Sequence, residues 1–132
     1  MNWVLDTNVL IHLARRHPTS VVARYTAVPV ERLAVSSVSV AELWYGAAGD
    51  ARPEARRAKL DHLLAPLRVP DLDRRAAEIA GQLRYTLRHA PVGQNDVYIA
   101  ATALAHGCGV VTANVREFSR VPGPAVEDWT AA

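Results

Sequence analysis

The chain is poor in the residues and patterns on which several protein classes depend. Its 132 residues include one cysteine, Cys108, so no internal disulfide can form, and the small apolar neighbours favour a buried thiol. No apolar run approaches the ~20 residues that a bilayer span needs, and Asp6 and Asn8 follow Met1 too closely for a signal peptide. We therefore expect a soluble, cytoplasmic protein that neither crosses a membrane nor relies on disulfides.

The sequence also lacks the motifs of several common active sites. The five histidines show no HxxxH or HExxH spacing, which argues against a zinc centre, and we interpret them as surface or helix-end residues. There is no glycine-rich phosphate loop, and Ser36 and Ser37 are not part of a nucleophile elbow. These absences argue against nucleotide triphosphatases and serine hydrolases.

Lysine is almost absent, because Lys59 is the only lysine among 15 basic residues and the other 14 are arginines. Arginine pairs bidentately with phosphate, so the paired arginines could contact nucleic acid; they are Arg15, Arg16, Arg56, Arg57, Arg74 and Arg75. Paired arginines on helices also serve as a solvated face. With a formal net charge of only +2, charge alone does not establish a nucleic-acid partner.

Short apolar segments alternate with longer segments of helical periodicity along the chain. We expect strands at 3–6, 33–39, 68–72 and 109–112, with a possible edge strand at 125–127. Helices are expected in the intervening segments, at 7–17, 20–28, 40–49, 51–67, 73–89 and 92–107. Without a repeat or a linker, residues 1–132 form one domain, and the alternation predicts a parallel α/β sheet covered on both faces.

Four acidic residues, Asp6, Glu42, Asp96 and Glu117, are placed alike, each just after a short apolar run, so that all four are expected at the carboxyl ends of strands. Each one has a local explanation, because Asp6 and either Asn95 or Asp96 could cap helices and Ser39 with Glu42 matches a capping box. Glu117 could be an exposed glutamate, although a helical turn would bring it near Asn114. Local capping does not explain why all four recur where parallel sheets bind ligands.

Carboxylates gathered at one edge of a sheet repel each other, and a cation is needed to keep them all ionised. All-oxygen ligands without paired histidine or cysteine favour Mg²⁺ or Mn²⁺ over zinc. Such a site retains water that can attack a phosphodiester while the metal stabilises the leaving oxygen. The acids therefore predict nuclease chemistry.

Four segments, LDTNVLI, SVAELWYGA, GQNDVYIAA and VVTANVREF, together resemble the PIN-domain ribonucleases, and in particular the VapC toxins of bacterial toxin–antitoxin pairs. The resemblance spans nearly the whole chain in motif order and spacing. It implies a PIN-like three-layer α/β/α sandwich with a mostly parallel central sheet of four or five strands. It also implies that Asp6, Glu42 and Asp96 bind the metal and that Glu117 meets the fourth acidic position. Many relatives carry an aspartate where this chain has Asn114, so the fourth ligand is the Asn114 amide, Glu117, or a water held by both.

The same resemblance implies that four polar residues orient the carboxylates, namely Thr7, Asn8, Ser39 and Thr112. The implied activity is Mg²⁺- or Mn²⁺-dependent endonucleolytic cleavage of structured RNA, commonly a tRNA, which arrests translation. The implied partners are a small antitoxin that blocks the acidic pocket and a second copy of the chain, which join in a larger complex. Trp44 and Tyr45 are candidates for partner or dimer contacts, or pack within the helices.

Two alternatives stay open at this point. A phosphoryl-transfer fold of receiver or haloacid-dehalogenase type also has an aspartate after its first strand, but it needs a lysine late in the fold, where this chain has none. A degenerate PIN domain that binds RNA or antitoxin without cleavage is made plausible by Asn114. Loss of RNA cleavage in carboxylate variants separates this binding protein from the enzyme.

Overall fold

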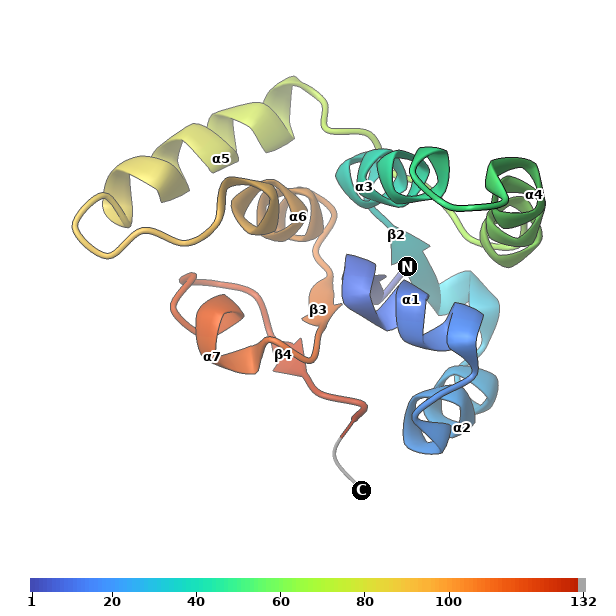
Figure 1. The fold of residues 1–132 in the computed structure, drawn as a ribbon. Coiled ribbons are helices and arrows are strands. Elements are labelled where there is room, and N and C mark those ends of the chain that lie inside the picture. Colours follow the sequence, from blue (N-terminus) through green and yellow to red (C-terminus); the bar gives the residue numbers. More distant parts are fainter. Residues whose placement is uncertain (131–132) are drawn as a thin grey trace.

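A computed structural model describes residues 1–130 and has a central sheet of four strands, all parallel, in the order β2-β1-β3-β4. Seven α-helices and one short 3-10 helix connect and cover the strands (Figure 1). In chain order the elements are β1 (Trp3–Leu5), α1 (Thr7–Arg15), α2 (Thr19–Ala27), η1 (Val30–Arg32), β2 (Leu33–Val35), α3 (Ser37–Ala48), α4 (Pro53–Leu64), α5 (Arg74–Thr86), α6 (Gln94–Ala105), β3 (Gly109–Val111), α7 (Val115–Phe118) and β4 (Val126–Glu127).

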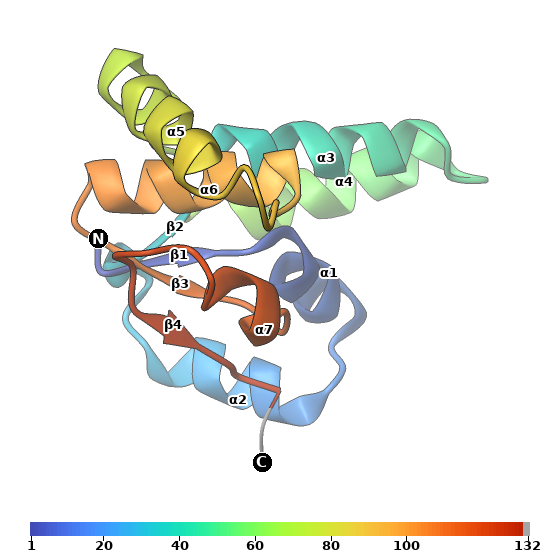
Figure 2. The same cartoon turned by 90° about the vertical axis from the view of Figure 1, so that its left-hand side faces the viewer.

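β1, β2 and β3 are buried on both faces, and side chains that alternate along them contribute to two separate cores, whereas β4 at the edge is partly buried. Val4, Ala34 and Val110 share one face and pack with residues of α5, α6 and α7. Leu5, Val35 and Val111 share the other face and pack with residues of α1, α2, α3 and α4. Figure 2 shows the sheet between the α6 and α2 layers, so the predicted three-layer sandwich is confirmed.

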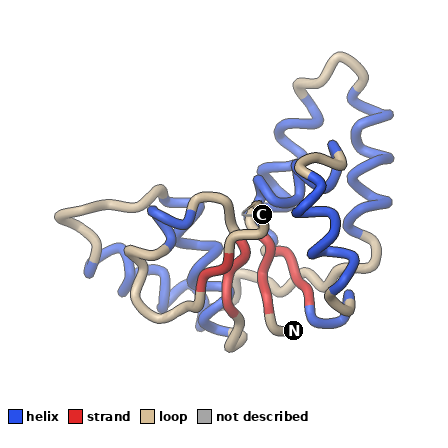
Figure 3. The backbone as a smooth tube through the Cα atoms, turned by 90° about the horizontal axis from the view of Figure 1, so that it is seen from below, coloured by secondary structure: helices blue, strands red, loops and turns tan. Residues whose placement is uncertain are grey.

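The expected strand at 68–72 is wrong. Arg68 forms a single bridge with Ala34, and its carbonyl accepts a hydrogen bond from the backbone N–H of Val35 at 2.9 Å. Pro70 has no N–H with which to continue such a ladder, so the pairing stops there. Four strands therefore lie side by side in Figure 3.

The strand expected at 33–39 is shorter than predicted, because β2 ends at Val35 and α3 begins at Ser37. The Ser36 hydroxyl caps α3 by accepting a hydrogen bond from the backbone N–H of Ser39 at 3.1 Å. The expected edge strand at 125–127 is confirmed as β4, which pairs with β3. Within residues 1–130, no helix is both long and apolar enough to cross a membrane.

Candidate active site

The carboxyl ends of β1, β2 and β3 meet at one edge of the sheet and carry polar residues in register. Leu5 pairs with Val35 and with Val111, so the following residues, Asp6, Ser36 and Thr112, lie at the same level. All three are buried, with exposed fractions of 3%, 0% and 0%. Burying a polar group is costly unless it is hydrogen-bonded. Three buried polar residues at one edge of the sheet therefore indicate a structured polar site.

Asp6 is held by two hydrogen bonds at the start of α1. The Thr112 hydroxyl donates to Oδ2 at 2.8 Å, and the backbone N–H of Thr7 donates to Oδ1 at 2.8 Å. Burial raises the pKa of Asp6, the two hydrogen bonds lower it, and the nearby charge of Glu42 raises it further. Asp6 thus caps α1, which confirms the expected local role. Its carboxylate also lies near that of Glu42, and capping does not prevent it from taking part in a metal site.

Glu42 projects from α3 toward the start of α1. The Thr7 hydroxyl donates to Oε1 of Glu42 at 2.7 Å and lies 2.8 Å from Oγ of Ser39. The predicted capping box of Ser39 and Glu42 is wrong, because Ser36 is the cap and Ser39 lies inside the helix. Ser39 and Thr7 instead link α3 to α1 beside the Glu42 carboxylate.

Asp96 lies in the first turn of α6, and its carboxyl group faces three other acids. Its pKa is raised to about 6, chiefly by burial and then by the nearby charges of Asp6, Glu117 and Glu42. The expected cap by Asn95 or Asp96 is wrong, because Gly93 occupies the N-cap position and no side chain among residues 1–130 caps α6. Asp96 is therefore free to point into the acidic site.

Glu117, in α7, accepts hydrogen bonds with both carboxylate oxygens. The backbone N–H of Gly93 donates to Oε1 at 2.8 Å, and the side-chain amide of Asn114 donates to Oε2 at 2.8 Å. These bonds, that of Gly93 foremost, lower the pKa of Glu117. The predicted closeness of Asn114 and Glu117 is confirmed, and Glu117 joins α7 to the start of α6.

Gly93 marks the point where two of the acids meet. A Cβ atom built on this glycine would lie 3.6 Å from Oδ2 of Asp96 and 3.7 Å from Oε1 of Glu117. Thr112 completes the arrangement, since its hydroxyl also accepts from the backbone N–H of Asn114 at 2.9 Å. Asn8 is exposed, and within residues 1–130 its side chain forms no hydrogen bond with the acids.

The acids lie close enough for their charges to raise the pKa of Asp96, but their oxygen atoms are not arranged around one point. Within residues 1–130, no three carboxylate, imidazole or thiol groups form a ready-made ligand set for a metal. Mutual repulsion works against such a set in the absence of a cation. Because Mg²⁺ keeps several of its waters and is commonly held by one or two carboxylates, a looser arrangement of oxygen ligands still suits it.

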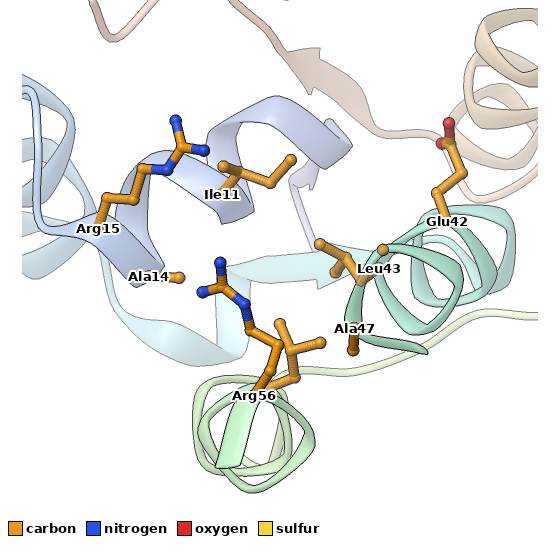
Figure 4. Close-up of a pocket in the computed structure, with 9 residues that line it drawn as sticks. Ile11, Ala14, Arg15, Glu42, Leu43, Ala47 and Arg56 are labelled. Carbon is orange, nitrogen blue, oxygen red and sulfur yellow. The ribbon is translucent and has the colours of Figure 1, made fainter. Parts of the chain in front are cut away.

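Two hollows adjoin at Glu42. One, of about 380 Å³, is lined by Glu42, Asp96 and residues 93–95. The other is a narrower cleft of about 140 Å³ between α1, α3 and α4, with Ile11, Leu43 and Leu60 among its apolar walls. Figure 4 shows the carboxylate of Glu42 on one side of this cleft and the guanidinium groups of Arg15 and Arg56 on the other. An acidic hollow therefore continues into an apolar cleft with basic groups.

Other predicted features lie away from this edge of the sheet. Cys108 is buried as expected, and burial raises the pKa of its thiol. Trp44 and Tyr45 have exposed fractions of 37% and 86%, so Tyr45 in particular packs little against the other described residues. His12 is partly buried, and its Nδ1 atom has no hydrogen-bond partner among the described residues.

Comparisons with known proteins agree with this geometry over almost the whole chain. The family described as PIN domain matches residues 3–124. The tRNA(fMet)-specific endonuclease VapC of Salmonella typhimurium is 37% identical over 131 residues, and ribonuclease VapC2 of Haemophilus influenzae is 34% identical over 131 residues. Each alignment covers 98% of both chains.

Solved structures give the same result. The DNA-bound VapBC complex from Salmonella typhimurium contains a chain with a TM-score of 0.91 and 37% identity, with 98% of each chain covered. VapBC2 from Rickettsia felis, bound to a fragment of promoter DNA, gives a TM-score of 0.88 at 31% identity and covers 98% of this chain and 99% of that one. The chain therefore belongs to the PIN-domain family and, within it, to the VapC ribonucleases.

Proposed function

We propose that this chain is a metal-dependent endoribonuclease, the toxin of a toxin–antitoxin pair, and that it cleaves structured RNA, specifically tRNA, in the cytoplasm. One observation carries the proposal: Asp6, Glu42 and Asp96 gather at the carboxyl edge of the sheet, where burial and the charges of Asp6, Glu117 and Glu42 raise the pKa of Asp96 to about 6. A perturbed carboxyl group in a hollow is typical of a catalytic site. The tRNA substrate is proposed by similarity to the Salmonella relative, which is named a tRNA(fMet)-specific endonuclease.

Asp6, Glu42 and Asp96 are the residues that would hold Mg²⁺, or Mn²⁺ in its place. Their oxygen atoms suit a hard cation, and a cation would relieve the repulsion that raises the pKa of Asp96. When bound, the ion supplies charge stabilisation on the phosphodiester and lowers the pKa of the attacking water.

Neighbouring side chains hold these carboxylates in place before substrate binds. Thr112 and the backbone of Thr7 fix both oxygens of Asp6, and the Thr7 hydroxyl fixes one oxygen of Glu42. Carboxylates fixed in this way need little rearrangement during the reaction, which favours catalysis.

Glu117 and Asn114 serve this site as positioning residues. Both oxygens of Glu117 already accept hydrogen bonds, and the Asn114 amide is used as a donor. Through the backbone of Gly93, Glu117 holds the first turn of α6 and therefore Asp96. This proposal gives the fourth acidic position a role that does not require it to touch the metal.

The apolar cleft beside Glu42 supports the proposed antitoxin partner. A segment with apolar side chains fits against Ile11, Leu43 and Leu60, and an arginine from it would pair with the acids. Occupying this cleft would block access to the catalytic carboxylates. Solved structures similar to this chain are VapBC structures, and one of them, from Mycobacterium tuberculosis, is named as a member of the VapBC family of toxin–antitoxin systems, which supports the assignment of such a partner.

We assign the exposed Tyr45, with Trp44 beside it on α3, to contact with a second copy of the chain, as part of a larger assembly with antitoxin. Exposed aromatic side chains are enriched at interfaces because they bury a large area at low entropic cost.

Sequencing RNA 5′ ends from cells that express this chain tests the proposed function and names the substrate. New ends should appear at a few positions, chiefly in tRNA, and should be missing from cells that express the Asp6→Asn variant. Equal 5′ ends in both samples would contradict the enzyme and would leave a PIN domain that binds RNA or antitoxin without cleaving.

A further inference from the structure

A third hollow, of about 440 Å³, lies beside the acidic one, between the end of α5 and the start of α6. Arg84, Tyr85 and Arg88 line it, and none of the carboxylates in the described residues does. Gln94 lines both this hollow and the acidic one, so the two adjoin. A positively charged surface thus begins where the catalytic acids end.

Tyr85 and Arg88 form a flat, charged surface in this hollow. The Arg88 guanidinium carbon lies 3.9 Å from the centre of the Tyr85 ring, and its Nη1 donates to the Tyr85 carbonyl at 2.8 Å. The Tyr85 side chain nevertheless has an exposed fraction of 67%. An arginine held over a ring and a largely exposed aromatic are the groups on which unpaired bases stack.

The loop that joins this surface to the acids is held in place from α7 and the residues after it. The Arg120 guanidinium donates to the carbonyl of Ala90 and, at 3.2 Å, to that of Pro91. Glu117 accepts from the N–H of Gly93 at 2.8 Å. These hydrogen bonds hold the loop in place and so fix the distance between the Tyr85–Arg88 pair and Asp96. A fixed distance of this kind is needed to position a substrate for cleavage.

We propose that the Tyr85–Arg88 pair stacks an unpaired nucleotide of the substrate RNA while Arg84 contacts a neighbouring phosphate, so that the strand continues from there into the acidic site. The inference rests on the proposed RNA-cleaving function. It explains why an acidic active site can engage a polyanion, because the attraction is supplied beside the acids rather than among them.

Charge favours RNA over a second copy of the chain as the occupant. Within residues 1–130, neither Arg84 nor Arg88 forms an ion pair, so no carboxylate neutralises either guanidinium charge. A symmetric contact between two copies would place the same patch on both partners, and like charges would oppose each other. RNA, in contrast, carries negatively charged phosphates that attract these arginines and flat bases that stack on the tyrosine.

Binding is best measured on the Asp6→Asn variant, which separates this inference from cleavage. The probe is a single-stranded RNA oligonucleotide of mixed sequence, compared with the same strand in a duplex. Tyr85→Ala should weaken single-strand binding about 5- to 100-fold, as expected from the loss of one base stack, whereas Tyr85→Phe should bind almost normally. Arg88→Lys, which keeps the charge but loses the flat guanidinium, should also weaken binding.

Salt dependence separates stacking from charge. Arg84→Ala should reduce the slope of log affinity against log salt by about 0.7, the value for one phosphate contact to a single strand. Tyr85→Ala should leave that slope unchanged, and Arg32→Ala, an exposed arginine outside the hollow, serves as the control for lost charge.

Unchanged single-strand affinity in both Tyr85→Ala and Arg88→Lys would overturn the inference. So would a change of oligomeric mass in Tyr85→Ala at constant RNA affinity, which would make this hollow an interface between copies. If the wild-type chain cleaves no RNA but the Asp6→Asn series behaves as described, the proposed function fails and the RNA-binding surface stands.

Discussion

Asp96 is the carboxyl group on which the negative charge of this site converges, so replacing it should stabilise the metal-free protein while removing activity. Its pKa rises from 3.8 to about 6 on folding. A pKa rise of that size means that ionisation of Asp96 lowers the free energy of unfolding by about 3 kcal/mol. Because the side chain is only half-buried, we expect about 1–2 kcal/mol after allowance for solvent. Asp96→Asn, which has the same shape without the charge, should recover that amount.

The effect has a definite pH dependence. Since the folded-state pKa of Asp96 lies above its unfolded value, the folded protein binds more protons between about pH 4 and pH 6. Asp96 therefore contributes most to the stability of the metal-free wild type below pH 4, and this contribution falls as the pH rises toward 6. The stability gain of Asp96→Asn should be small at pH 4 and complete at pH 7.

Urea unfolding in excess chelator at pH 4 and pH 7 measures this directly, with Asp61→Asn, an exposed aspartate on α4, as the control for loss of one negative charge. Adding Mg²⁺ at pH 7 should stabilise the wild type by mass action and stabilise the variant much less. A chelated Asp96→Asn protein that is less stable than the wild type at pH 7, or a gain that is the same at both values of pH, would refute the electrostatic account.

Two further predictions concern the residues that hold the acids. Thr112→Val should lower cleavage activity by about 10- to 100-fold, because Asp6 loses a hydrogen bond that orients it, whereas Thr112→Ser should stay near wild type; steady-state cleavage rates check both. Glu117→Ala should speed hydrogen exchange at the Gly93 amide and raise the Mg²⁺ concentration needed for half-maximal cleavage, because the start of α6 is released. Unchanged exchange and unchanged Mg²⁺ dependence would show that Glu117 does not position this turn.

The sequence predicts the position of Asp6, because a short apolar strand directly precedes it. The expectation that Glu42, Asp96 and Glu117 also lie at strand ends is wrong, because these three acids lie in α3, α6 and α7. Leu5, Val35 and Val111 end three parallel strands in register, and buried parallel strands are visible as apolar runs. The residue after each strand is then brought to one edge, whatever the connecting helices do. Asp6 directly follows such a run, so its position at this edge is predictable from the sequence.

Local details of the site are harder to predict, because more than one local pattern fits the same residues. Ser36 and Ser39 both precede a helical segment, and only the observed end of β2 identifies Ser36 as the cap. The bond between Gly93 and Glu117 joins residues 24 apart in the sequence and leaves no periodic signal. The Tyr85–Arg88 surface also depends on how α5 packs, which composition does not reveal.

The most direct test of the central claim is cleavage of tRNA by the purified chain with added Mg²⁺. We predict fragments with wild-type protein, no fragments in excess EDTA, restored cleavage when Mg²⁺ or Mn²⁺ is returned, and no cleavage by Asp6→Asn, Glu42→Gln or Asp96→Asn. Cleavage that persists in EDTA, or that survives these three substitutions, would contradict the assignment of the acidic edge of the sheet as the active site.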